Sequence, residues 1–240
     1  MLLTYSDLLQ HGFLLFLTFF GAVVTALLCG VAFHEFSHAW AADRLGDRTA
    51  RTMGRVSLNP LRHLDPTGTV FMMIGGFGWG KPVPVNPHRL RHGPQTGRAI
   101  VAAAGPVANL VLAVLASLPI HLGLVAWRSP FLVPFNIGNW GFSDYAGLFL
   151  ASMIIFNIVL AVFNLLPIAP LDGFAVFVGL LPRDLSLSLA RLEPYGPGIL
   201  MLLLVLPFVT SGSVNILYEF MSPLINGLTN LIGGGGRALA

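Results

Sequence analysis

Charged residues and cysteines are both scarce in this chain of 240 residues. Asp, Glu, Lys and Arg together make up 10% of the sequence, whereas a soluble globular domain carries about 25%. Hydrophobic residues reach 55%, and the mean hydropathy is +0.78. The single cysteine, Cys29, excludes an internal disulfide and a zinc site built from cysteines. The composition therefore excludes an ordinary soluble domain and indicates a membrane protein.

Four stretches contain no Asp, Glu, Lys or Arg and are long enough to cross a bilayer, which takes roughly 20 residues. They are residues 8–34, 99–127, 145–171 and 194–218. A fifth apolar run, residues 66–80, is too short and too interrupted by glycine for a plain span, and a sixth covers only residues 173–182. The sequence predicts an all-α polytopic membrane protein, a single membrane-embedded domain over residues 1–240, with about four to six transmembrane helices.

The cationic residues are concentrated in one region. Nine of the 13 Lys and Arg residues fall between positions 44 and 98, which is the segment between the first and second apolar stretches. Positively charged loops of membrane proteins face the cytoplasm. We therefore expect the amino terminus outside and the first helix running inward. Because the cations form one loop, they do not indicate a nucleic-acid partner.

Local signals predict where the elements begin and end. The first helix is expected from about residue 12 to 42, with a C-terminal stop at Leu45-Gly46-Asp47. Residues 68–87 mix β-branched and aromatic residues with Gly and Pro, which predicts a small β-hairpin dipping into the membrane. Pro167 and Pro170 must bend or break the third helix. Residues 214–232 either continue the last span or form an interfacial helix.

A metal-binding pattern lies at the inner end of the first helix. The residues His34-Glu35-Phe36-Ser37-His38 form the motif HExxH. Histidines one turn apart on a helix can bind the same metal, and the glutamate can reach a water molecule on that metal. Ionisable groups in a membrane segment are costly, which favours a functional role. The alternative is a helix end at the interface with solvated side chains.

Two histidines do not complete a catalytic zinc site, which typically has three protein ligands and one open position. Among the acidic residues, Asp43 and Asp47 are too close to the motif along the first helix to close the site. Asp65 is a possible ligand. Asp172 is the best candidate, because it follows an apolar run and lies at the inner end of the third span, at the same depth as the motif.

Five motifs in order carry a resemblance over about residues 20–182. They are HEFSH, SLNPLRHLDPTGT, WGKPVPVNP, AAAGPVANL and FNLLPIAPLDG. In this order they resemble the site-2 protease family of intramembrane zinc metalloproteases, the peptidase M50 type. The segment between the first two spans leaves no room for the PDZ domain of larger members, so the chain resembles a minimal bacterial or archaeal form.

The resemblance implies His34, His38 and Asp172 as the ligands of one Zn²⁺. It implies Glu35 as the catalytic acid and base, and Asn164 as a donor to the oxyanion or to the substrate backbone. Outside these positions, we interpret His63 as a structural hydrogen-bonding residue. Asn109 and Asn157 are most simply interhelical hydrogen-bonding residues, and Asn109 is the better candidate to line the site.

We therefore expect an intramembrane zinc metalloprotease that hydrolyses a peptide bond in or near a transmembrane segment of a membrane protein, as in regulated intramembrane proteolysis. The expected partners are the lipid bilayer and a transmembrane substrate, in a prokaryotic cell membrane, with the active site nearer the cytoplasmic side. The alternative is a non-catalytic metal carrier or transporter using the same ligands. A prenyl-protein protease is disfavoured, because no downstream Glu-x-x-x-His motif is present.

Overall fold

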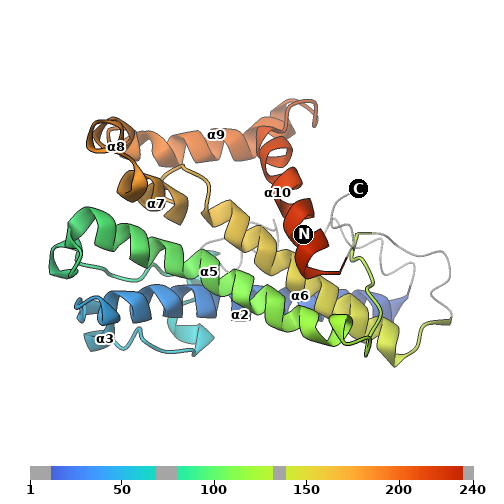
Figure 1. Ribbon diagram of the computed structural model, residues 1–240. Helices are drawn as coiled ribbons and strands as arrows, with labels where there is room; N and C mark the ends of the chain where they lie inside the picture. The colour runs from blue at the N-terminus through green and yellow to red at the C-terminus, as the bar shows by residue number, and fades with distance from the viewer. Residues whose placement is uncertain (1–11, 69–79, 132–138, 235–240) are drawn as a thin grey trace.

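Three long helices form the first layer of the molecule. The structure is a computed structural model that describes residues 12–68, 80–131 and 139–234. Helices α2 (Phe13–Arg44), α5 (Gly93–His121) and α6 (Phe142–Asn164) pack against one another in all three pairings. Figure 1 shows them running side by side along the length of the molecule. We call these three helices the inner layer.

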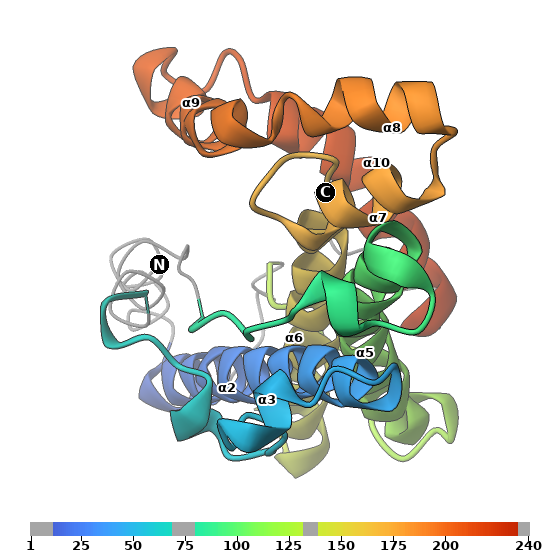
Figure 2. The same ribbon diagram turned by 90° about the vertical axis from the view of Figure 1, so that its left-hand side faces the viewer.

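A second group of shorter helices covers one side of the inner layer. Helices α7 (Asp172–Leu180), α8 (Arg183–Ala190), α9 (Gly196–Val209) and α10 (Ile216–Ile232) make up this outer layer, with the single turn η4 (Glu193–Tyr195) between α8 and α9. Figure 2 shows α8 and α9 crossing the top of the molecule above α7. The outer layer is joined to the inner one by α7, which packs on α5, and by α10, which packs mainly on α6.

Four helical stretches are long and apolar enough to cross a membrane by length and composition: α2, α5, α6 and the run Arg183–Val209. The predicted all-α polytopic fold with at least four spans is therefore confirmed. The prolines act as the sequence predicts, and residues 214–232 do not continue the last span. The third helix ends at Asn164, before Pro167 and Pro170, because proline disrupts the helical hydrogen bonds. Residues 216–232 form the separate helix α10, after a turn in which Ser211 and Gly212 have positive φ angles.

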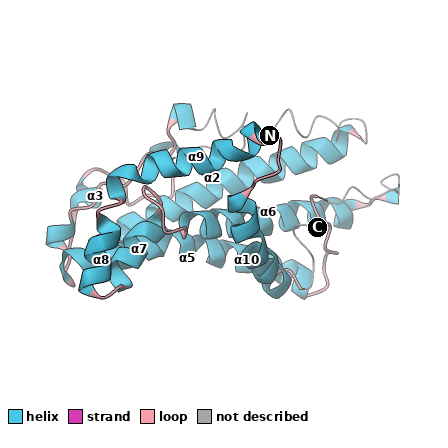
Figure 3. Cartoon of the chain, turned by 90° about the horizontal axis from the view of Figure 1, so that it is seen from above, coloured by secondary structure: helices cyan, strands magenta, loops and turns pink. Residues whose placement is uncertain are grey.

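The predicted β-hairpin over residues 68–87 is not supported. Among the described residues the structure contains no strand, and only an isolated antiparallel bridge joins Leu64 to Gly80; the cartoon in Figure 3 shows helices and loops. Residues 69–79 of that prediction lie outside the described residues. In residues 81–87, Pro82, Pro84 and Pro87 lack an amide hydrogen, so this part of the chain cannot form a ladder on both of its sides.

The loop between α2 and α5 carries short helices in its described parts, and three of them have both ends within the described residues. They are α3 (Thr49–Thr52), η1 (Pro60–Arg62) and η2 (Pro87–Arg89). Helix α2 is 32 residues long, or roughly 48 Å at 1.5 Å per residue, which exceeds the roughly 30 Å of a bilayer core. The helix is therefore longer than a perpendicular crossing of the hydrocarbon region requires. Gly46 follows the helix with a φ of 107° and ends it where the sequence predicts.

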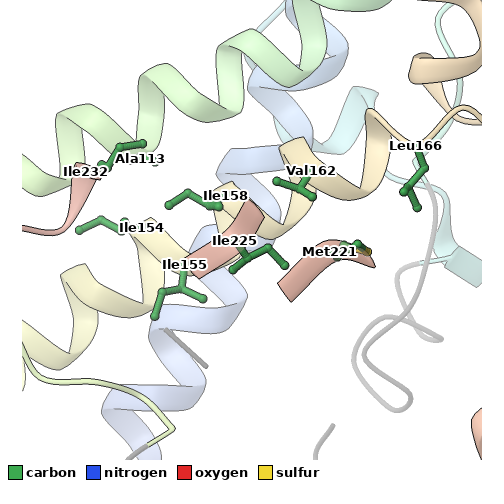
Figure 4. Packing of buried hydrophobic residues seen from close by; sticks show 9 residues of the cluster. All are labelled: Ala113, Ile154, Ile155, Ile158, Val162, Leu166, Met221, Ile225 and Ile232. Carbon is green, nitrogen blue, oxygen red and sulfur yellow. The ribbon is translucent and has the colours of Figure 1, made fainter. Parts of the chain in front are cut away.

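The largest apolar cluster lies between α6 and α10. Ile154, Ile155 and Ile158 are fully buried on α6, and they pack with Met221 and Ile225 of α10. The close-up in Figure 4 shows these side chains filling the space between the two helices. This packing attaches α10 to the inner layer, so that the outer layer is held at both of its ends.

Candidate metal centre

The two histidines of the HExxH motif face a carboxylate from the outer layer. His34 and His38 lie one turn apart on α2, and both side chains are about nine-tenths buried. Their Nε2 atoms lie 2.9 Å and 3.2 Å from Oδ2 of Asp172, the first residue of α7. The structure thus brings Asp172, which is far away in the sequence, to the two histidines, and sequence analysis singled out all three as ligand candidates.

The spacing of these atoms suits a tetrahedral metal. Nitrogen and oxygen ligands lie about 2.0–2.2 Å from zinc, so neighbouring ligand atoms of a tetrahedron are separated by roughly 3.3 Å. The three ligand atoms of His34, His38 and Asp172 lie within 4.8 Å of one another. Oδ2 of Asp172 is buried and accepts no hydrogen bond within the described part of the chain. A bound cation would satisfy this oxygen, so the donor set fits a metal ion.

A glycine on α5 leaves room for that ion. A side-chain Cβ atom at Gly105 would lie 2.5 Å from Nε2 of His38 and 2.6 Å from Nε2 of His34. Such distances are too short for a carbon atom but are close to a metal–ligand bond length. The missing side chain therefore leaves a small space beside both nitrogens. In the sequence, Gly105 within AAAGPVANL indicates close helix packing, but its place beside the ligand atoms was not predicted.

Helix α5 also contacts the far side of both imidazole rings. Nδ1 of His34 lies 2.7 Å from Oδ1 of Asn109, and Nδ1 of His38 lies 2.8 Å from the carbonyl oxygen of Val101. Val101, Gly105 and Asn109 are spaced four residues apart, so they share one face of the helix. Asn109, the better candidate of the two asparagines, thus lies beside a predicted ligand. The role of Val101 had no signal in the sequence, because a backbone carbonyl is present at every residue.

Glu35 lies next to the metal-ligand group without belonging to it. Successive residues of a helix are about 100° apart around its axis, so Glu35 does not share the face of His34 and His38. It is partly buried. Its Oε1 lies 3.4 Å from the position that a Cβ atom would take at Gly80. Glu35 therefore lies between the ligand group and the segment that begins at Gly80.

Polar contacts with the loop that follows α2 hold residues 81–86 in place. The amide of Lys81 donates to the carbonyl oxygen of His63 at 2.7 Å. The guanidinium of Arg55, which is buried, donates to the carbonyl oxygens of Lys81 and Pro82. The amide of Asn86 donates to Oδ2 of Asp47 at 2.6 Å. Three anchors thus hold this loop segment beside the site, and sequence analysis did not identify Arg55 or Asp47 in this role.

Asp47 is the ionic anchor of this segment. Burial raises the pKa of its carboxyl, but hydrogen bonds from the hydroxyl and amide of Thr49 and from the amide of Asn86 have the larger combined effect. The pKa of Asp47 therefore lies below its ordinary value. Asp47 stays ionised at neutral pH and accepts all three hydrogen bonds.

The remaining candidates have other contacts. His63 is fully buried, with Nε2 2.6 Å from the carbonyl oxygen of Ser57, and it lies outside the metal-ligand group. Oδ1 of Asp65 accepts a hydrogen bond from the amide of Gly68. Asp43 pairs with Arg51 at 2.7 Å. These contacts agree with the expectation that His63 is structural, and they leave Asp172 as the carboxylate beside the histidines.

Asn164 is the last residue of α6. Its Nδ2 donates to the carbonyl oxygen of Leu160, one turn earlier in the same helix, at 2.9 Å. An amide nitrogen carries two hydrogens, so this bond leaves one donor for another partner. The role of Asn164 toward a substrate stays a prediction.

Comparison with known proteins agrees with this geometry. A model of Peptidase family M50 matches residues 22–125, which include the HExxH motif and the α5 face. "Putative zinc metalloprotease YwhC" of Bacillus subtilis is 37% identical over 185 residues, which cover 77% of this chain and 80% of the relative. The chain belongs to peptidase family M50. It is a membrane metalloprotease, and zinc is its cofactor.

Two other relatives extend the match over most of the chain. "Putative zinc metalloprotease Rip2" of Mycolicibacterium smegmatis is 30% identical over 222 residues, covering 90% of this chain and 78% of the relative. Rip2 of Mycobacterium tuberculosis is 27% identical over 227 residues, covering 92% and 80%. No solved structure matches the chain. The M50 relationship therefore rests on sequence similarity, and the structure shows the arrangement of the site.

Proposed function

We propose that this M50 protein is an intramembrane zinc endopeptidase of the site-2 type. His34, His38 and Asp172 would hold the zinc, and Glu35 would serve as acid and base. The observation that carries the proposal is the convergence of three ligand atoms from α2 and α7 within 4.8 Å, beside the space at Gly105. Two histidines and one carboxylate leave a fourth position open, as catalytic zinc sites require.

The chemistry is hydrolysis of a peptide bond. Bound zinc supplies a Lewis acid that polarises the scissile carbonyl and makes a water molecule acidic enough to attack at neutral pH. Glu35 takes a proton from the attacking water. As the carbon–nitrogen bond breaks, Glu35 returns that proton to the leaving amine. The free amide hydrogen of Asn164 would donate to the oxygen that becomes negative as the carbonyl is attacked.

The substrate would be a transmembrane segment of another protein, cleaved in regulated intramembrane proteolysis. A helical segment hides its carbonyl groups in its own hydrogen bonds, so it must unwind before cleavage. Residues 80–86 offer an anchored backbone beside Glu35, and Val83 and Val85 carry amide hydrogens between the prolines. We propose that the unwound substrate pairs with this segment, as a peptide adds to the edge of a sheet.

The active site would face the cytoplasmic side of a prokaryotic cell membrane. The arginine-rich loop between α2 and α5 supports this orientation, because positive loops stay in the cytoplasm. Arg91→Cys and Asn139→Cys place single exposed thiols at opposite ends of the inner layer once Cys29 is replaced by serine. An impermeant thiol reagent is expected to label position 91 only from the cytoplasm and position 139 only from outside. The reverse labelling pattern would contradict the orientation.

The decisive test of the catalytic role is Glu35→Gln. The ligands remain, so we expect the variant to keep its zinc while cleavage of a membrane-embedded reporter is abolished. Zinc content and cleavage are measured on the same purified protein in lipid vesicles. Glu219→Gln, in α10, is the matched control and is expected to cleave normally. Cleavage by Glu35→Gln at the wild-type rate would refute the protease mechanism and favour a metal carrier, for which Glu35 is not required.

A further inference from the structure

Two fully buried asparagines connect the metal-ligand group to the centre of the inner layer. Asn109 on α5 and Asn157 on α6 have no solvent-exposed surface. Polar side chains inside a membrane helix bundle are costly unless they are hydrogen-bonded, and those that occur often have a function. Nδ2 of Asn109 donates to Oδ1 of Asn157 at 3.0 Å, and Oδ1 of Asn109 lies 2.7 Å from Nδ1 of His34. A continuous chain therefore runs from α6 through α5 to a metal-ligand candidate on α2.

The donors and acceptors of this hydrogen-bonded series are fixed in order from α6 to α2. Nδ2 of Asn157 donates to the carbonyl oxygen of Met153 at 2.9 Å, which turns Oδ1 of Asn157 toward Asn109. Nδ2 of Asn109 also donates to the carbonyl oxygen of Gly30 at 3.1 Å. Both partners of this nitrogen are oxygens that only accept, so the nitrogen end of the Asn109 amide must face them. The oxygen end must then face His34.

This direction decides where the proton of His34 resides. The amide oxygen of Asn109 can only accept a hydrogen bond, so Nδ1 of His34 must carry the hydrogen. In a neutral imidazole the other nitrogen then has the free lone pair, and Nε2 is the atom that faces Asp172. Without the contact to Asn157, only the hydrogen bond to the carbonyl oxygen of Gly30 would oppose rotation of the Asn109 amide.

The local shape is adapted to these contacts. A Cβ atom at Gly30 would lie 3.0 Å from Oδ1 of Asn157, 3.2 Å from Nδ2 of Asn109 and 2.8 Å from a methyl group of Leu160. A larger residue would push both amides away from α2. The glycine therefore allows two side chains from two other helices to reach the turn that precedes His34.

We propose that Asn109 is a positioning residue that holds His34 with Nδ1 protonated and Nε2 free for the metal, and that Asn157 sets the direction of the Asn109 amide. The inference rests on the proposed zinc site and adds to it a two-residue relay from α6. Neither asparagine touches substrate in this role. The positioning role acts on metal affinity, which typically falls about 10–100-fold when a group that orients a ligand is lost.

The test uses two substitutions of Asn157 that have similar size but different hydrogen bonding. Asn157→Asp keeps an oxygen that accepts from Asn109, whether the carboxyl is protonated or ionised. Asn157→Leu removes that oxygen. Asn109→Leu removes the contact to His34 itself. Ser152→Ala is the matched control, because Ser152 is equally buried on α6 but donates only to the carbonyl oxygen of Leu148 in its own helix.

Zinc affinity is measured by competition with a chelator on purified protein in detergent. We expect Asn109→Leu to bind zinc about 10–100-fold more weakly. Asn157→Leu is expected to bind zinc more weakly than wild type but less severely, while Asn157→Asp and Ser152→Ala keep the wild-type affinity. A second readout is the Nδ1 proton of His34 in protein labelled with ¹⁵N-histidine. It is expected to exchange slowly in wild type and Asn157→Asp, and fast in both leucine variants.

The outcomes separate this inference from the proposed function. A wild-type protein that binds no zinc would refute the proposed zinc site. If wild type binds zinc but Asn109→Leu binds it equally well, only the positioning role is overturned. If Asn157→Asp loses as much affinity as Asn157→Leu, while both remain folded in a thermal unfolding experiment, the relay is overturned and Asn157 is structural.

Discussion

The inner and outer layers differ strongly in how much of their surface the rest of the chain covers. The most apolar windows of α2, α5 and α6 are 39%, 39% and 56% buried, whereas that of the run Arg183–Val209 is 11% buried. Helix α9 presents large exposed apolar side chains, among them Met201, Leu202 and Phe208. The inner helices are therefore positioned by packing against one another, whereas the rest of the chain leaves most of α9 uncovered.

The candidate metal centre lies across this boundary. The inner layer supplies His34 and His38, both held from behind by α5. The outer layer supplies Asp172, whose helix α7 packs on the same α5. The comparison indicates that the histidine side is rigidly built, whereas the carboxylate side depends on a single short helix. Substitutions in the two layers can test this difference.

The largest effect is expected from Gly105→Ala in the inner layer. The new Cβ atom would occupy the space 2.5–2.6 Å from both Nε2 atoms, so we expect zinc binding and cleavage to be lost. Gly198→Ala in α9 is the matched control, because a Cβ atom there meets no atom within 4 Å. Zinc content after purification is the measurement. Full zinc content in Gly105→Ala would mean that the ion does not occupy the space beside this glycine.

The next largest effect is expected at Asn164, where the inner layer ends and the chain turns toward Asp172. If its free amide hydrogen stabilises the oxyanion, Asn164→Ala is expected to lower kcat roughly 10²-fold or more. Zinc content and thermal stability are expected to remain at the wild-type level, because the bond to Leu160 lies within one helix. A parallel loss of stability and activity would instead indicate a structural role, and normal cleavage would remove Asn164 from the active site.

The smallest effect is expected from an ion pair between the layers. Nη2 of Arg98 on α5 lies 2.8 Å from Oε1 of Glu193 in η4, and both side chains are nearly half exposed. Solvent screening limits such pairs to about 0–1 kcal/mol. Arg98→Gln is therefore expected to lower the free energy of unfolding by less than about 1 kcal/mol, with zinc content unchanged. Arg191→Gln is the control, and thermal unfolding in detergent at low and high salt provides the comparison.

A much larger loss of unfolding free energy in Arg98→Gln would contradict this account of how the outer layer is held. It would show that the outer layer depends on this contact rather than on lipid and on the packing of α7 and α10. A double variant with Glu193→Gln separates the pair from its surroundings, because the two substitutions should then not add.

The sequence predicts the parts of the molecule that depend on local chemistry. The HExxH spacing places His34 and His38 on one face of α2 because a helix repeats every 3.6 residues. Gly46 ends that helix, and Pro167 and Pro170 follow the end of α6, because both effects act on the adjacent backbone. The choice of Asp172 among ten acidic residues followed from depth in the membrane.

Features that depend on contacts between distant residues were not predictable in the same way. The composition of residues 68–87 resembles strands, but the described part is held by Arg55 and Asp47 without a ladder. The role of Gly105 depends on the two histidines of α2 that face it, which the sequence around the glycine does not show. The carbonyl of Val101 carries no sequence signal either. The packing of α10 on α6 required the three-dimensional arrangement, and the sequence therefore left two alternatives open for residues 214–232.

The central claim is that one zinc site is built from both layers. It is tested most directly by zinc content, measured by mass spectrometry on purified wild type, Asp172→Ala and Asp65→Ala. Asp65 is the other acidic candidate of the sequence, and it lies outside the metal-ligand group. The account predicts one zinc per chain in wild type and Asp65→Ala, and little or none in Asp172→Ala. An Asp172→Ala protein that keeps its full zinc content would contradict it.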